Sequence, residues 1–221
     1  MNRLFVRPIR LSRWQVVTLK TAIHVLCLGY LITVFSLAIL DRLGADPVES
    51  LLHATGLGSI NLLMVTLCIS PLAQRLPCGD LIRCRRLVGL YCFSYALAHF
   101  AAYLLFELQL DWTLLTSEII ERPYITVGFT ALMLLLVLAA TSPNAIQRRL
   151  RHRWQTVHNF VYLCAALGLL HYTWSLKTLW GNPLFYWAGF VLLMSQRKSK
   201  LAAWSKSVGT LFSPRASSEK S

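Results

Sequence analysis

Several histidines lie inside apolar segments of this 221-residue chain, and three of them, His99, His158 and His171, are candidate metal ligands. The last two share one stretch, residues 154–174, which is apolar enough to cross a membrane. An ionisable residue inside a spanning helix is rare and by default marks a functional site. Imidazole is also a common axial ligand of heme iron. These residues therefore indicate a membrane protein that moves electrons through heme.

His99 and His171 are predicted to lie at a similar depth. At ~1.5 Å per helical residue, His99 lies ~20 Å beyond Arg86, and His171 lies ~25 Å beyond Trp154. Two imidazoles that face each other across a helical bundle can bind one heme from both sides, which favours electron transfer over oxygen chemistry. Alternatively, each histidine only forms a hydrogen bond between helices.

His158 lacks an evident partner. The positions on the neighbouring predicted helix that match its depth hold Arg85 and Arg86. Its separation of 13 residues from His171 also places the two side chains about 140° apart on an ideal helix. We interpret His158 as a heme ligand with an unusual partner such as His24, or as a contact for a quinone or flavin. His53 is interpreted as a surface contact, a quinone-site ligand or a residue without a special role.

The composition is that of a membrane protein. Hydrophobic residues make up 56% of the chain, charged residues only 14%, and the mean hydropathy is +0.54, whereas soluble domains contain about 25% charged residues. The net charge of +13 comes from residues between the apolar runs, so it indicates membrane topology rather than nucleic-acid binding. The six cysteines form no C-x-x-C pair, and neither a disulfide framework nor a zinc site is predicted.

We predict an all-α fold, a polytopic bundle of six transmembrane helices. Residues 1–15 are expected to form a cytoplasmic basic tail, residues 16–194 the heme-binding membrane domain, and residues 195–221 a second basic tail that is partly disordered. The predicted helices cover residues 16–40, 56–72, 87–108, 124–140, 154–174 and 183–194. The last is shorter than the ~17 residues that usually span a membrane.

Charge asymmetry predicts the orientation of the bundle. With six crossings, 19 of the 22 Lys and Arg residues fall on one side, and most of the acidic residues fall on the other. The positive-inside rule then places both termini in the cytoplasm.

The arginine clusters around Arg85 and Arg149 either anchor this topology on anionic membrane lipid or clamp a flavin phosphate or heme propionates. The chain contains no G-x-G-x-x-G motif or P-loop, so we expect a membrane quinol or a separate protein as the electron donor.

Several short motifs in a fixed order resemble the MsrQ (YedZ) family of heme-binding membrane subunits. They are Gly44-Ala45-Asp46-Pro47, Ser70-Pro71-Leu72, Arg85-Arg86-Leu87, Arg122-Pro123-Tyr124, His158-Asn159-Phe160 and His171-Tyr172. The resemblance implies a ferric-reductase-like domain in the bacterial inner membrane, with heme b and FMN as cofactors. It implies His99, His158 and His171 as heme ligands, of which His158 departs from the wider pattern because an arginine stands where its partner is expected.

The resemblance also implies a pathway. Electrons from the quinone pool, or from a reduced flavin, would pass to MsrP, a periplasmic molybdopterin enzyme that reduces methionine sulfoxide in oxidised periplasmic proteins. The chain itself would then have no catalytic reductase site. Two other interpretations remain: a stand-alone ferric or cupric reductase with the same heme core, and a small transporter or scaffold without redox function.

Overall fold

The computed structural model describes residues 10–205 except residues 77 and 199. Within this part the chain is helical and has no strand, so the all-α prediction is confirmed. The long helices are α1 (Arg13–Ile39), α2 (Pro47–Arg75), α3 (Ile82–Ala102), α5 (Pro123–Ala140), α8 (Val161–Ser175) and α9 (Asn182–Ser195). The shorter elements are η1 (Gly79–Leu81), the π-helical turn η2 (Tyr103–Glu107), α4 (Trp112–Glu121), α6 (Asn144–Leu150) and α7 (His152–His158).

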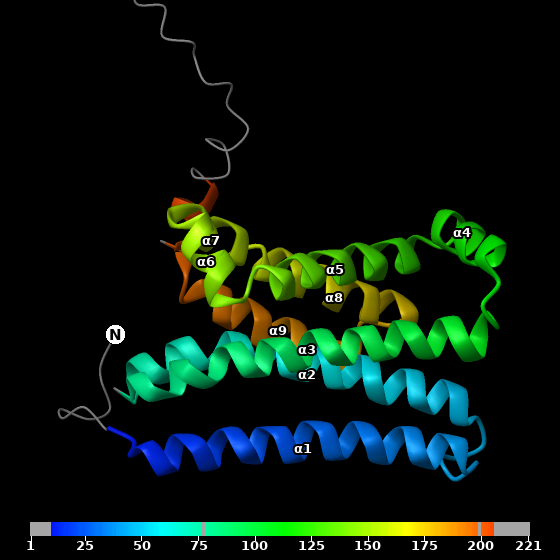
Figure 1. Ribbon diagram of the computed structural model, residues 1–221. Helices are drawn as coiled ribbons and strands as arrows, with labels where there is room; N and C mark the ends of the chain where they lie inside the picture. Colours follow the sequence, from blue (N-terminus) through cyan, green and yellow to red (C-terminus); the bar gives the residue numbers. More distant parts are fainter. Residues whose placement is uncertain (1–9, 77, 199, 206–221) are drawn as a thin grey trace, which may run out of the picture.

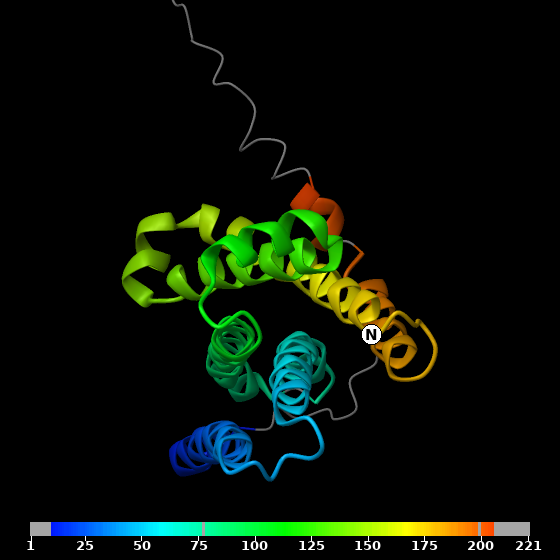
Figure 2. The same ribbon diagram turned by 90° about the vertical axis from the view of Figure 1, so that its right-hand side faces the viewer.

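The long helices are stacked in layers (Figures 1 and 2). α1 lies on one side of the closely packed pair α2 and α3, and α5 and α8 lie on the other side, with α9 next to α8. The main core lies where α2, α3, α5 and α8 meet, and it includes the fully buried Leu67 and Cys92. Small and branched side chains at this centre let the helices approach closely, as is common in membrane bundles.

α2 is longer than the sequence predicted. Asp46 caps it by accepting a hydrogen bond from the Glu49 amide at 2.9 Å, and Pro47 occupies the first turn, where its missing N–H costs nothing. Residues 47–55, which lie before the predicted helix over residues 56–72, are therefore the first part of α2. As a consequence, His53 belongs to a helix of membrane-spanning length.

The predicted helix over residues 154–174 is divided into α7 and α8. Phe160 N–H donates to the Val157 carbonyl at 3.0 Å, and Tyr162 N–H donates to the Asn159 carbonyl at 3.1 Å. Both bonds span three residues rather than four, which tightens the turn and interrupts the helix. His158 is the last residue of α7, so its direction relative to His171 does not follow from an ideal helix.

α4 forms a surface helix at the end of the bundle that carries most of the acidic residues (Figure 1). Asp111 caps it, and hydrogen bonds from the Thr113 side chain and then from the Leu114 and Thr113 amides hold the pKa of this carboxyl below its usual value. The Tyr103 hydroxyl donates to Glu118, which also pairs with Arg122 at 3.0 Å. These contacts fix α4 against the end of the third long helix.

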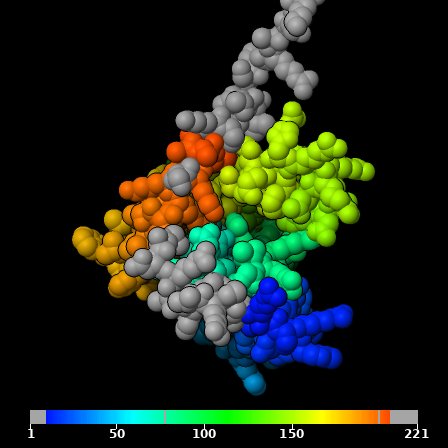
Figure 3. Space-filling view, turned by 90° about the vertical axis from the view of Figure 1, so that its left-hand side faces the viewer, coloured from blue at the N-terminus to red at the C-terminus, as the bar shows by residue number. Residues whose placement is uncertain are grey.

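Four segments of the described chain are long and apolar enough to span a membrane: α1, α2, α5, and α3 together with η1 and η2. α8 and α9 have 15 and 14 residues and fall below that length, so the predicted count of six is not confirmed. Most of the described basic residues lie in or beside α6, α7, the start of α3 and the start of α1. These segments are at the end of the bundle that faces the viewer in Figure 3. The first and last described residues lie at this same end (Figure 1).

The described part of the C-terminal tail packs on the bundle. Arg197 is only 6% exposed, and Trp204 packs edge-on against Phe160 and Tyr162 while its indole N–H donates to the Thr156 carbonyl. In the described part of the tail expected from residue 195, a turn at residues 196–197 leads into further helical residues that end at residue 205. Residues 206–221 and 1–9 of the two predicted tails lie outside the described part.

Candidate functional site

His99 on α3 and His171 on α8 face each other inside the bundle. Their ring centroids are 6.2 Å apart, and the ring planes are inclined by 80°. Both side chains are partly buried. The predicted similarity in depth is therefore present as a direct approach of the two imidazoles, although they come from segments more than seventy residues apart.

A backbone carbonyl orients each of these imidazoles. His99 Nδ1–H donates to the Leu52 carbonyl of α2 at 2.9 Å, with the Thr55 hydroxyl also nearby. His171 Nδ1–H donates to the Tyr124 carbonyl of α5 at 2.7 Å. A proton fixed on Nδ1 leaves Nε2 as the basic nitrogen, which is how proteins orient and strengthen metal-binding histidines.

Two glycines leave space for these rings. A Cβ atom at Gly128 on α5 would lie 2.6 Å from His171 Nδ1, and one at Gly56 on α2 would lie 3.2 Å from the His99 ring. The first distance is well below the 3.5–4.0 Å at which carbon atoms make favourable contacts. Each imidazole therefore sits against the backbone of a neighbouring helix at a position without a side chain.

The donor set fits a heme iron. Two imidazoles bound in line to opposite faces of one metal, each at roughly 2 Å, have ring centroids about 6 Å apart. The observed separation of 6.2 Å agrees with this. Phe100 and Phe129, with ring centroids 5.8 Å apart, add aromatic surface between α3 and α5.

His158 lies apart from this pair, at the basic end. Its Nε2 forms a hydrogen bond with the Thr141 hydroxyl at 3.2 Å, and its ring stacks on Trp154 with centroids 4.0 Å apart. Thr141 caps the C-terminal end of α5. Near the other end of the same helix, the Tyr124 carbonyl accepts the hydrogen bond from His171. The break between α7 and α8 thus directs both histidines toward α5, which removes the angular conflict expected for an unbroken helix.

Arginines surround His158 instead of a second histidine. Arg85 of α3 is close enough to interact electrostatically with His158 and with Arg197. His24, on α1, forms a hydrogen bond with the Tyr91 hydroxyl of α3 at 2.7 Å. α1 and α8 lie on opposite sides of the pair α2 and α3 (Figure 2). The suggested pairing of His24 with His158 is therefore wrong, because the layer formed by α2 and α3 separates them.

Arg197 is a site residue that the sequence did not reveal. Its guanidinium lies 5.3 Å from the centre of the Tyr162 ring, donates to the Tyr162 hydroxyl at 3.1 Å and also donates to the Leu67 carbonyl. Within the described chain, no carboxylate pairs with Arg197 or Arg85. A position just after the last apolar run resembles any other basic residue of a tail, so only the folded chain distinguishes it.

The comparison with known families gives the class of this site. Residues 55–169 match the family described as ferric reductase like transmembrane component. The matched segment runs from α2 into α8 and contains His99 and His158, whereas His171 lies two residues beyond it. The fold and the site therefore define a ferric-reductase-like transmembrane domain.

Similar curated proteins define the family more narrowly. The chain is 43% identical over 196 residues to the protein-methionine-sulfoxide reductase heme-binding subunit MsrQ of Cronobacter sakazakii, 42% identical over 196 residues to that of Salmonella arizonae, and 41% identical over 198 residues to that of Pectobacterium carotovorum. Each comparison covers 88% of this chain and 98% of the relative. The chain belongs to the MsrQ family. No solved structure matches it significantly.

Proposed function

We propose that this chain is the membrane electron-transfer subunit of a protein-methionine-sulfoxide reductase system, with heme b held between His99 and His171. The relatives are named heme-binding subunits of such a reductase. The observation that carries the proposal is the approach of two imidazoles to 6.2 Å, each oriented by a backbone carbonyl. When bound, heme supplies a one-electron carrier. The chain holds the two nitrogens in place and surrounds them with apolar helices.

The proposed membrane arrangement has six crossings with both termini in the cytoplasm of a bacterial inner membrane. α7 and α8 together cover residues 152–175, enough to cross despite the break, and α9 continues into the helical residues that follow it. The concentration of basic residues at one end supports this orientation. The acidic end, which includes α4, then faces the periplasm.

FMN is proposed to bind at the basic end, with its phosphate near Arg85 and Arg197. A buried cation without a carboxylate partner favours a bound anion, and arginine binds phosphate through two parallel hydrogen bonds. Arg197 is 6% exposed, and Arg85 is anchored by Ser70 at 3.2 Å. His158 interacts electrostatically with Arg85, so it is proposed either to contact the flavin or to bind iron there.

Replacing Arg85 with Gln, or Arg197 with Lys, is expected to weaken FMN binding by roughly tenfold or more, because each change removes a charged or two-pronged hydrogen-bond donor. Titration of purified protein with FMN, followed by flavin fluorescence, measures this. Arg83→Gln is the matched control, because Arg83 is exposed and paired with Asp80. Equal FMN affinity in all three variants would contradict the assignment.

The proposed acceptor is MsrP, the periplasmic molybdopterin methionine-sulfoxide reductase, and the proposed donor is the quinone pool or a reduced flavin. Exposed acidic residues at the α4 end would attract a basic surface on that partner. In proteoliposomes that contain quinol, the full chain is expected to support methionine-sulfoxide reduction by MsrP, and His99→Ala is expected to abolish it. Reduction of ferric chelates at the same rate without MsrP would favour a stand-alone metal reductase instead.

A further inference from the structure

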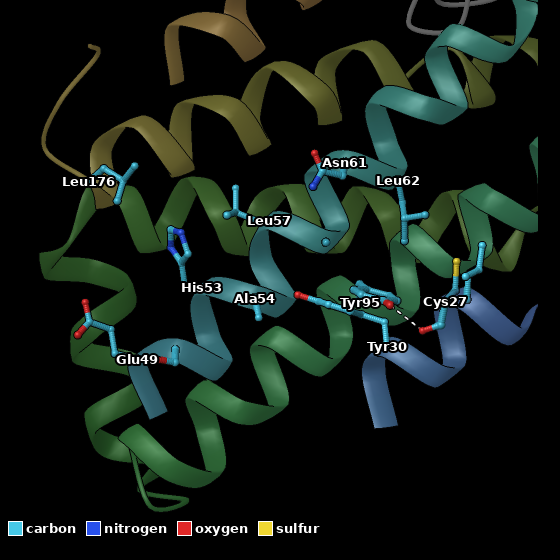
Figure 4. Close-up of a pocket in the computed structure, with 13 residues that line it drawn as sticks. Cys27, Tyr30, Glu49, His53, Ala54, Leu57, Asn61, Leu62, Tyr95 and Leu176 are labelled. Atoms are coloured by element: carbon cyan, nitrogen blue, oxygen red, sulfur yellow. Dashed lines mark hydrogen bonds between the residues drawn. The ribbon is translucent and has the colours of Figure 1, made fainter. Parts of the chain in front are cut away.

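A groove between α1 and α2 opens on the side of the bundle. Its volume is about 860 Å³, and Tyr30, Glu49, His53, Asn61 and Tyr95 are among the residues that line it. Figure 4 shows that α2 contributes most of its wall, with α1 on one side and Leu176 near one end. The groove lies beside helices of membrane-spanning length, so its occupant would reach it from the lipid phase.

Polar side chains follow one face of α2 inside this groove. Glu49, His53, Leu57 and Asn61 are spaced four residues apart and therefore lie in one row along the helix. His53 lies ~9 Å and Asn61 ~21 Å from the start of α2, so Asn61 is near the middle of an apolar layer about 30 Å thick. Both side chains are exposed. Polar groups facing lipid at this depth meet no water, so any hydrogen-bonding capacity that the protein leaves unused favours a bound polar ligand.

The neighbouring contacts leave hydrogen-bonding capacity for such a ligand. The Tyr186 hydroxyl donates to Asn61 Oδ1 at 2.7 Å and so directs the Asn61 amide N–H groups elsewhere. Within the described chain, no hydrogen bond is recorded for the His53 ring, which lies 6.4 Å from the Tyr172 ring. The His53 ring can thus accept or donate a hydrogen bond to a ligand, while the Asn61 amide can donate one.

The charges of the groove restrict the occupant. Among its described lining residues there is no lysine or arginine, and Glu49 is the acidic one. An anionic phospholipid headgroup would therefore meet no counter-charge, and an acyl chain alone would leave the polar row unpaired. A neutral headgroup with two oxygen atoms and an apolar tail satisfies both conditions.

We infer that this groove binds the headgroup of a membrane quinone, with one ring oxygen at His53 and the other at Asn61. A quinone ring with a hydrogen bond at each oxygen spans about 11 Å, which matches the ~12 Å rise between these two positions on α2. The adjacent face of α2 touches the other site, since Gly56, three residues after His53, lies against the His99 ring. This inference rests on the proposed function, for which it provides the site of the electron donor.

Binding of radiolabelled decylubiquinone to the full-length protein in phosphatidylcholine nanodiscs tests this inference, with empty nanodiscs as the blank. Saturable binding is expected for the unchanged protein. His53→Leu and Asn61→Leu are each expected to raise Kd about fivefold or more, as expected for one lost hydrogen bond. Leu57→Trp, which fills the groove, is expected to abolish saturable binding. His152→Leu, at the basic end, is the matched control and should leave Kd unchanged.

The heme absorption spectrum of the same samples separates this inference from the proposed function. A normal heme spectrum is expected in the groove variants, because none of the changed side chains contacts His99 or His171. The inference is overturned if decylubiquinone binds no more than to empty nanodiscs, as it would if an acyl chain filled the groove. It is also overturned if the groove variants bind like the unchanged protein. Absence of heme from the unchanged protein would instead contradict the proposed function, whatever the quinone result.

Discussion

His99→Ala and His171→Ala are each expected to lower the content of low-spin heme b to below about a tenth of the unchanged protein, since either change removes half of the axial ligand pair. The measurement is the ratio of the Soret band to protein in purified samples. The pair is 6.2 Å apart, and neither ring has another histidine at comparable distance in the described chain. No other histidine ring is therefore in direct ring contact with either imidazole to replace a lost ligand.

His158→Ala separates the two sites. It is expected to leave the low-spin signal of the His99–His171 heme in place, because His158 lies at the other end of α5, against Thr141 and Trp154. His152→Ala serves as the control for a histidine on the exposed basic surface. If His158→Ala removed the same signal as His99→Ala, the two ends of the bundle would not be independent and the ligand assignment would be wrong.

Gly128→Ala is expected to lower heme content by roughly ten- to a hundredfold, as losses of the group that orients a metal ligand usually do. The added methyl would lie 2.6 Å from His171 Nδ1, so the ring must move away from the Tyr124 carbonyl that orients it. Heme content per purified protein again provides the measurement.

Gly168→Ala is the matched control for Gly128→Ala. Gly168 lies on α8, the helix that carries His171, and a methyl group there would meet no atom within 4 Å. It should therefore keep its heme. Equal heme content in the two variants would show that His171 tolerates displacement and is not the ligand.

The helices and the histidine pair could be predicted because their signals are local or depend on simple counting. Apolar runs bounded by charges gave the all-α fold, and depth along two parallel segments brought His99 and His171 to the same level. The role of the glycines beside the two imidazole rings could be predicted only in part from the sequence. Gly56 and Gly128 are small residues in spanning helices, which indicate close packing but not which side chain fills the space.

Other features depended on tertiary contacts. The tight turn at Asn159 and Phe160 contains neither proline nor glycine, so the local sequence did not predict the break in the helix. Arg197 resembles a solvated tail residue until it is buried against Tyr162. His53 is a different case. It lay outside the predicted helix although Asp46 and Pro47 are a local start signal for the longer α2.

The central claim is that His99 and His171 together hold one low-spin heme b. The most direct measurement is the reduced-minus-oxidised absorbance spectrum of the detergent-purified protein after heme-replete expression, recorded for the unchanged chain and for His99→Ala and His171→Ala. Sharp b-type Soret and α bands in the unchanged protein, lost in both variants, are the predicted result. A colourless unchanged protein, or an unaltered spectrum in either variant, would contradict the account.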